Sequence, residues 1–278
     1  MNIKKLSQLF LLASSVVFCG FYASAFADNN NFESIIEENV SASLKNTEVN
    51  NVGANSDKSE YPVMKGCLGI GRLKTTRKIV ALTFDDGPHQ KYTKEILEIL
   101  KLNNVRATFF VIGKNAQSCK ECENAIKTAY RNGNIIASHT YAHADLRKLT
   151  NDEIKIELTK TDEIIYRLIK ERPVLFRSPY GGCSARTAKE VSGLGFTAIA
   201  WSDMTNDYDA AHVTPEKIAG DIIRYVHPGA IIGLHDGGGN RAKTVKALSI
   251  IIDTLRNDGY EFFTIPELLN VEAYRVVA

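Results

Sequence analysis

Two adjacent carboxylates, Asp85 and Asp86, are the most chemically suggestive residues of the chain. They end an apolar run at residues 79–84, IVALTF, and are followed by Gly87-Pro88. Neighbouring carboxylates repel each other and are costly to desolvate unless a positive charge lies beside them. The pair therefore indicates that a metal ion or a cationic side chain is bound at this point of the fold.

Two histidines offer ligands for such an ion. His139 and His143 are four residues apart, a spacing that would place both imidazoles on one side of a helical turn. With one carboxylate they make a set of two His and one Asp that leaves a position open for water, which is typical of a catalytic zinc site. Two histidines at this spacing more often have a structural role, so this interpretation depends on Asp85 and Asp86.

A bound metal would give the two aspartates different tasks. One carboxylate can hold the ion while the other takes a proton from water, whose pKa falls from about 15.7 toward about 7 on zinc. Arg177 and His235 follow other apolar runs and offer a cationic group and a proton donor. Such a set suffices for hydrolysis of an acyl group, and the residues alone leave open whether an amide or an ester is cleaved.

Short apolar runs alternate with longer amphipathic segments, which predicts repeated β-α units. We expect strands at residues 78–84, 107–112, 134–138, 173–177, 196–201, 229–234 and 260–264. Helical segments between them include residues 91–104, 151–170, 214–226 and 242–259. Seven such units favour a distorted or incompletely closed (β/α)7 barrel of parallel strands, with its chemistry at the carboxyl ends of the strands. No glycine-rich phosphate loop follows the first strand, so we expect no nucleotide cofactor.

Four motifs follow one another along the chain: TFDDGP at 83–88, HTYAH at 139–143, RSPYGG at 177–182 and IGLHD at 232–236. In this order they resemble the polysaccharide deacetylase family, also called the NodB homology domain or carbohydrate esterase family 4. The resemblance covers residues 78–269 and implies an α/β fold, the distorted (β/α)7 barrel of this family. It also implies metal-dependent hydrolysis of the N-acetyl group of an amino sugar in an extended glycan.

The resemblance implies a role for each matching residue. Asp85 would be the general base, oriented by Arg177, and His235 the general acid, paired with Asp207. The zinc ligands would be Asp86, His139 and His143. The backbone N–H of Tyr180 would stabilise the oxyanion. Contacts with the substrate are expected from Pro179, Gly181, Trp201, Tyr208 and Leu234, the last against the acetyl methyl group.

One motif departs from the family. Where a pattern like DxxDW usually follows the strand that bears the Trp, residues 201–210 read WSDMTNDYDA, with Met204 at the first Asp position and Tyr208 where a Trp is common. The glycan therefore stays open among peptidoglycan, chitin oligomers and a surface polysaccharide. Zn²⁺ is the expected metal, with Co²⁺ or Ni²⁺ as substitutes. A glycan-binding protein without activity and a metal-dependent O-acetyl esterase are the alternatives.

The first 27 residues have the pattern of an export signal. Lys4 and Lys5 precede an apolar run at residues 9–18, and small residues at 25–27 offer a cleavage site. The run is short for a membrane span, and Phe18 before Cys19 disfavours a lipoprotein. We expect a periplasmic or secreted protein with a polar, flexible segment at residues 28–65 and a catalytic domain at 66–278.

Charge and cysteine content narrow the class further. Without Lys4 and Lys5 the mature chain has 32 basic and 32 acidic residues, which argues against a nucleic-acid binder. We expect an N-acetylated glycan as the ligand and no stable protein partner. Four cysteines remain after cleavage, an even number that favours disulfides in an exported protein. Three pairings are possible, and we expect Cys119–Cys122 together with Cys67–Cys183.

Overall fold

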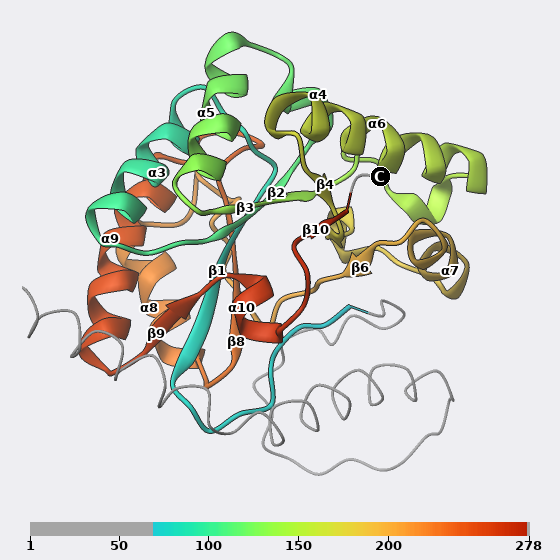
Figure 1. Ribbon diagram of the computed structural model, residues 1–278. Coiled ribbons are helices and arrows are strands. Elements are labelled where there is room, and N and C mark those ends of the chain that lie inside the picture. The colour runs from blue at the N-terminus through green and yellow to red at the C-terminus, as the bar shows by residue number, and fades with distance from the viewer. Residues whose placement is uncertain (1–68, 277–278) are drawn as a thin grey trace, which may run out of the picture.

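A computed structural model describes residues 69–276 of the chain (Figure 1). The expected export signal at 1–27 and the polar segment at 28–65 lie outside the described residues, as does Cys67. Among the described residues, none of the helices has the length and apolar character needed to cross a membrane.

A parallel sheet forms the centre of the fold, and β1 (Ile79–Asp85) is its best-paired strand. It pairs in parallel with β2, β8 and β9, and the strand order is β6-β5-β3-β2-β1-β8-β7. The other strands are β2 (Thr108–Val111), β3 (Ile135–Ser138), β5 (Leu175–Phe176), β6 (Thr197–Ala198), β7 (Asp203–Met204), β8 (Ala230–His235) and β9 (Glu261–Phe263). Each of the seven strands expected from the sequence overlaps one of them, and β7 is additional.

The sheet curls because its two end strands are neighbours in sequence. Residues 199–202 join β6 directly to β7, and the Ser202 amide donates to the Ile231 carbonyl of β8 at 3.0 Å. The segment at 70–72 lies in the remaining gap, where Ile70 bridges to Ile199 and Arg72 to Ala230. The expected distorted barrel of parallel strands is therefore confirmed as a curled, half-barrel sheet.

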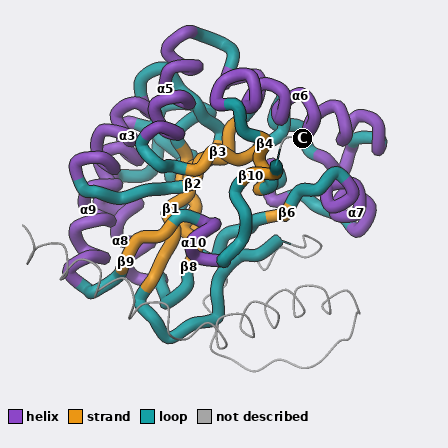
Figure 2. The backbone as a smooth tube through the Cα atoms, viewed as in Figure 1, coloured by secondary structure: helices purple, strands orange, loops and turns teal. Residues whose placement is uncertain are grey.

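Helices cover the outer face of this sheet (Figure 2). They are α3 (Tyr92–Leu102), α4 (Gly113–Ala116), α5 (Lys120–Arg131), α6 (Asn151–Ile169), α7 (Ala185–Gly193), α8 (Pro215–Tyr225) and α9 (Ala242–Asn257). The helices α3, α6, α8 and α9 match the four segments expected from amphipathic spacing. Their apolar stripes pack against the sheet because burial of that surface stabilises the fold.

Smaller elements complete the described chain. The helix α10 (Ile265–Leu269) lies over the inner face of the sheet, and β10 (Tyr274–Arg275) pairs antiparallel with β4 (Arg172–Pro173). The turns η2 (Leu146–Lys148) and η3 (Pro179–Gly181) follow β3 and β5.

Side chains alternate between the two faces of each strand, so the core has an outer layer under the helices and an inner layer inside the curled sheet. On β8, Ile232 and Leu234 belong to the outer layer with residues of the covering helices. Ile231 belongs to the inner layer with Phe110 of β2. Since successive side chains point to opposite faces, Gly233 and His235 lie on the inner side with Ile231.

The disulfide predicted between Cys119 and Cys122 is confirmed. Cys119 is half-exposed at the start of α5, and Cys122 is buried in its first turn. The pairing of Cys183 with Cys67 stays a prediction because Cys67 is not among the described residues.

Candidate metal centre and active site

The carboxyl ends of five strands carry the chemistry. Asp85 ends β1, and His235 ends β8 directly beside it, in register across the strand pair. His139 follows β3, Arg177 follows β5, and Asp207 follows β7. Parallel strands direct their carboxyl ends to one edge of the sheet, so residues up to 150 positions apart in sequence meet there.

Asp86, His139 and His143 form a compact set of potential metal ligands, with their ligand atoms within 4.8 Å of one another. Asp86 Oδ1 lies 3.4 Å from His139 Nε2 and 3.1 Å from His143 Nε2. Neither contact has the geometry of a hydrogen bond, and this buried Oδ1 has no hydrogen-bond partner in the described part of the chain. A buried acceptor without a partner is costly.

The tautomer of His139 explains why this ring offers no hydrogen to the oxygen. His139 Nδ1 lies 2.8 Å from the Arg177 carbonyl, which can only accept, so Nδ1 carries the proton. In the neutral ring the lone pair of Nε2 then faces Asp86. Because lone pairs converge on one point, the set fits a divalent cation, and the Arg177 carbonyl acts as the outer partner that orients a ligating histidine.

Electrostatics favour the ligating form of Asp86. Burial alone would raise the pKa of this carboxyl, but His139 and His143 lower it well below its ordinary value when their rings carry a proton on Nε2. A cation would act in the same direction, since a nearby positive charge stabilises the carboxylate. Asp86 is therefore ionised at neutral pH.

The expectation that His139 and His143 share a helical turn is wrong. Residues 139–143 form an irregular loop in which Thr140 has φ of 66° and His143 has φ of 57°. Asp86 has φ of 71°, also in the left-handed region. Each such residue costs roughly 1–3 kcal/mol and persists only where its surroundings hold it. The left-handed turns, rather than a helix, aim both imidazoles at Asp86.

Arg177 holds Asp85 in place. Its Nη1 donates to Asp85 Oδ1 at 2.8 Å and to Thr83 Oγ1 at 2.7 Å, and its Nη2 donates to the Ala200 carbonyl at 2.9 Å. The side chain is fully buried, and its guanidinium lies 4.1 Å from the centre of the Phe110 ring. Because Thr83 and the Ala200 carbonyl also hold the buried guanidinium, Arg177 is fixed in position and in turn fixes the Asp85 carboxylate.

His235 pairs with Asp207, as expected. His235 Nδ1 lies 2.7 Å from Asp207 Oδ1, and the backbone amide of His235 donates to Oδ2 at 2.9 Å. Thr244 Oγ1 also donates to Oδ2, at 3.0 Å. Burial lowers the pKa of His235, but the Asp207 charge and its hydrogen bond raise it more, with a contribution from Asp85, to about 9.

Two exposed tyrosines stand beside these groups. Tyr180 is 66% exposed, and its ring lies edge-on to His143 with the centres 4.6 Å apart. Tyr208 is 55% exposed, and its ring lies edge-on to His235 with the centres 6.0 Å apart. Trp201 is half-buried, and the centre of its ring lies 5.5 Å from the Arg177 guanidinium.

The other expected substrate contacts are less accessible. Pro179 and Gly181 flank Tyr180 in the turn η3, and both are buried. Tyr180 itself has φ of 57°, so the turn presents this ring outward while its neighbours pack inward.

Leu234 does not join the site, and its expected contact with an acetyl group is wrong. Its side chain is fully buried in the outer layer, on the opposite face of β8 from His235, and its strand neighbour is Phe84. Gly233 is the neighbouring residue that lies on the same face of β8 as His235. Alternation already gives this result, because consecutive strand residues point to opposite faces.

Several supporting residues were not assigned to the site from the sequence. Thr83 precedes Asp85 by two positions on β1, so alternation could have placed it beside Arg177. Asp236 is buried, and its Oδ2 accepts from Thr93 Oγ1 at 2.6 Å. Burial raises its pKa to about 7, against the Thr93 hydrogen bond and with the nearby Asp86 charge adding to the rise. A Cβ at Gly87 would lie 2.1 Å from Asp236 Oδ2, which excludes any larger residue there.

Comparisons with known proteins agree with this geometry. The profile of the polysaccharide deacetylase family matches residues 72–199. A peptidoglycan-N-acetylglucosamine deacetylase from Bacillus cereus is 36% identical over 197 residues, covering 70% of each chain. The chitin deacetylase structure from Colletotrichum lindemuthianum has a TM-score of 0.69 and 30% identity, covering 77% of this chain and 97% of that one.

One further solved structure shows that a protein with this fold can lack enzymatic activity. A CE4 family pseudoenzyme from Bacillus anthracis has a TM-score of 0.66 and 26% identity, covering 84% of this chain and 81% of that one. The fold therefore occurs with and without activity, so only the side chains of the site distinguish the two cases.

Proposed function

Because the chain belongs to the polysaccharide deacetylase family, we propose that it is a metal-dependent hydrolase that removes N-acetyl groups from N-acetylglucosamine-type residues of a glycan. One observation carries this proposal. The ligand atoms of Asp86, His139 and His143 lie within 4.8 Å of one another, and the adjacent Asp85 lies in register with His235 across the β1–β8 pair. That arrangement supplies a metal site, a base and an acid in one place.

A divalent cation held by Asp86, His139 and His143 would lower the pKa of water and polarise the acyl carbonyl. Asp85 is the proposed base that takes the proton from the attacking water, because Arg177 fixes its carboxylate and Asp86 would be occupied as a ligand. The backbone N–H of Tyr180 is the proposed donor to the oxyanion.

His235 is the proposed acid that protonates the departing amine. Its raised pKa of about 9 keeps the ring charged at neutral pH, and Asp207 on Nδ1 leaves Nε2 as the proton donor. An amine leaves an amide only when it is protonated, so this donor is needed for N-deacetylation.

For the glycan, we propose a polymer such as peptidoglycan or chitin. The relatives act on these two classes, as their names state. The exposed rings of Tyr180 and Tyr208 offer flat apolar surfaces beside the two histidines. The export signal expected at residues 1–27 is consistent with the proposed action outside the cytoplasm, where such polymers lie.

The test is acetate release from peptidoglycan, chitooligosaccharides and an envelope polysaccharide, measured before and after treatment with a chelator. We expect release from at least one N-acetylated glycan, loss after chelation, and recovery on adding Zn²⁺, Co²⁺ or Ni²⁺. Acetate release that is unaffected by chelation would contradict the metal-dependent mechanism.

The same assay addresses the alternatives. A metal-dependent esterase would release acetate from O-acetylated glycans and leave N-acetyl groups intact. A glycan-binding protein without activity, as the pseudoenzyme structure illustrates, would bind the polymer and release nothing. The intact acid and base favour the hydrolase.

A further inference from the structure

The short helix α4 and the residue before it contact both loops that carry the metal ligands. The Ile112 amide donates to the Gly87 carbonyl at 2.9 Å, next to Asp86. The Gly113 and Lys114 amides donate to the Thr140 and Tyr141 carbonyls at 3.0 and 2.8 Å, between the two histidines. One segment therefore joins two loops that are otherwise distant in sequence.

Asn115 makes the contact closest to a ligand. Its side-chain Nδ2 donates to the backbone carbonyl of Asp86 at 2.9 Å. Asp86 has φ of 71°, a conformation that a non-glycine residue keeps only when its surroundings hold it. The Asp86 carboxylate must also stay directed at His139 and His143. The Asn115 hydrogen bond holds the backbone of Asp86, while the two histidines face its side chain.

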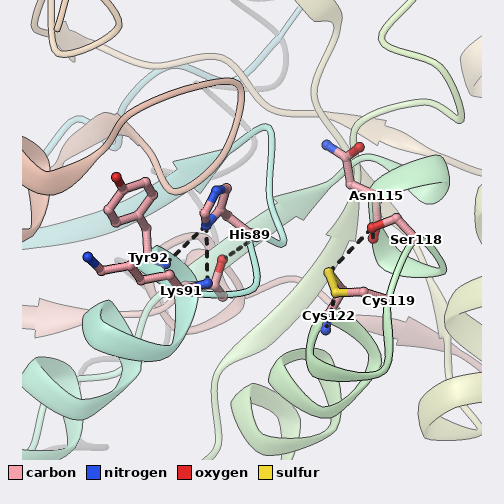
Figure 3. Close-up of a disulfide and its surroundings, with 8 residues drawn as sticks. His89, Lys91, Tyr92, Asn115, Ser118, Cys119 and Cys122 are labelled. Carbon is pink, nitrogen blue, oxygen red and sulfur yellow. Dashed lines mark hydrogen bonds between the residues drawn. A yellow bond between two sulfur atoms is a disulfide. The ribbon is translucent and has the colours of Figure 1, made fainter.

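The Cys119–Cys122 disulfide follows Asn115 and Ser118 in sequence, and Figure 3 shows these four residues together. Ser118 connects the two: its amide and its hydroxyl both donate to the Asn115 carbonyl, at 3.1 and 2.9 Å, and its Oγ lies 3.3 Å from Cys122 Sγ. Cys122 is buried in α5. The disulfide therefore joins the N-cap residue of α5 to the first turn of that helix, and Ser118 connects it to Asn115.

We propose that Asn115 is a positioning residue for Asp86, and that the Cys119–Cys122 disulfide keeps Asn115 in place. The inference rests on the proposed function in that Asp86 is taken as a metal ligand. Asn115 touches neither the metal position nor the substrate; it acts through the backbone of Asp86. Outer partners of metal ligands commonly contribute about tenfold or more to metal affinity.

The measurement is Zn²⁺ affinity of the purified, metal-free protein, by competition with a chromophoric chelator well below the unfolding temperature. Asn115→Ala should bind Zn²⁺ about tenfold more weakly. Asn115→Asp keeps the size but replaces the N–H donor by an acceptor, so it should be at least as weak. Asn124→Ala, an exposed amide on α5 beyond the disulfide, is the matched control and should bind as the parent does.

The disulfide is tested by Cys119→Ser combined with Cys122→Ser, which avoids a reductant that could also act on Cys183. This double variant should bind Zn²⁺ more weakly. Adding Asn115→Ala to it should cost less than Asn115→Ala costs in the parent, because both changes act through one contact. Full additivity would show that the disulfide does not act through Asn115.

The outcomes separate this inference from the function on which it rests. Parent-like affinity in both Asn115 variants, with loss in Asp86→Ala, would overturn the positioning role and leave the metal site standing. Parent-like affinity in the cysteine double variant would overturn the part assigned to the disulfide. Absence of Zn²⁺ binding in the parent itself would overturn the proposed function and this inference together.

Discussion

His235 Nδ1 lies 2.7 Å from Asp207 Oδ1, across 28 residues of sequence. The carboxylate is buried, and both of its oxygens are occupied by His235 and Thr244. It therefore does two things at once: it fixes which imidazole nitrogen is free, and it stabilises the charged ring. The predictions for the acid side of the reaction follow from this pair.

The His235–Asp207 pair predicts the alkaline limb of the pH profile. The pKa of His235 is raised to about 9, so kcat should fall as pH rises through about 9. Asp207→Asn removes the charge that raises the pKa, and the limb should move to lower pH, with kcat reduced about a hundredfold or more. Steady-state kinetics from pH 6 to 10 check both. An unmoved limb in Asp207→Asn would assign it to another group.

The same pair has a consequence for stability. Because the pKa of His235 is raised above its ordinary value of 6.5, its contribution is complete below about pH 6.5 and is lost as pH rises through about 9. Urea unfolding of the parent and of His235→Gln should therefore differ more at pH 6 than at pH 10.

Asp85→Asn should abolish turnover while the metal stays bound. The amide keeps the size of the side chain but cannot accept a proton, so the loss should be about a hundredfold or more. Zinc content by elemental analysis and acetate release are the measurements. Asp253→Asn, on the exposed side of α9, is the matched control. Near-parental rates in Asp85→Asn with zinc present would make the base assignment wrong.

His139→Ala and His143→Ala should each lose both zinc and activity, since a site of three ligands cannot spare one. His212→Ala is the control, because this histidine is 81% exposed in its side chain and binds Asp209 instead. Metal content after dialysis separates the three variants. Zinc retained at parental affinity in either of the first two would exclude that residue as a ligand.

Arg177→Met should destabilise the fold strongly. It leaves the Asp85 carboxylate buried without its cation, a change that typically costs about 3–5 kcal/mol. Combining it with Asp85→Asn removes the unpaired charge and should recover part of that loss. Urea unfolding of the three variants gives the coupling. Equal stability of Arg177→Met and the double variant would mean that Asp85 does not depend on Arg177.

Asp236→Asn should flatten the pH dependence of stability in the metal-free protein. The pKa of Asp236 is raised from 3.8 to about 7, so the folded state holds a proton that the unfolded state releases. The free energy of unfolding therefore falls as pH rises between these values, by up to roughly 4 kcal/mol for a shift of this size. The free energy of unfolding of Asp236→Asn should lack this fall. Urea unfolding of the metal-free parent and variant between pH 4 and 8 is the measurement.

Much of the fold could be predicted because most strands and helices show a local hydrophobic pattern in the sequence. Apolar runs such as 79–84 and 230–234 lie in β1 and β8, and amphipathic segments gave α3, α6, α8 and α9 close to their observed ends. The strand β7 escaped notice because Asp203–Met204 is too short to show any period. The loop at 139–143 was misjudged because left-handed residues leave no pattern in the sequence.

The residue types at the carboxyl ends of the strands could be identified from the amino-acid sequence, because strand ends follow from local hydrophobic patterning. The tertiary structure decided how they act together. The tautomer of His139, the pairing of Asp207 with His235 and the hold of Asn115 on Asp86 join segments that are distant along the chain. Leu234 turned away from the site because neighbouring strand residues face opposite layers. Such relationships depend on register and loop conformation, and those are fixed only when the whole sheet packs.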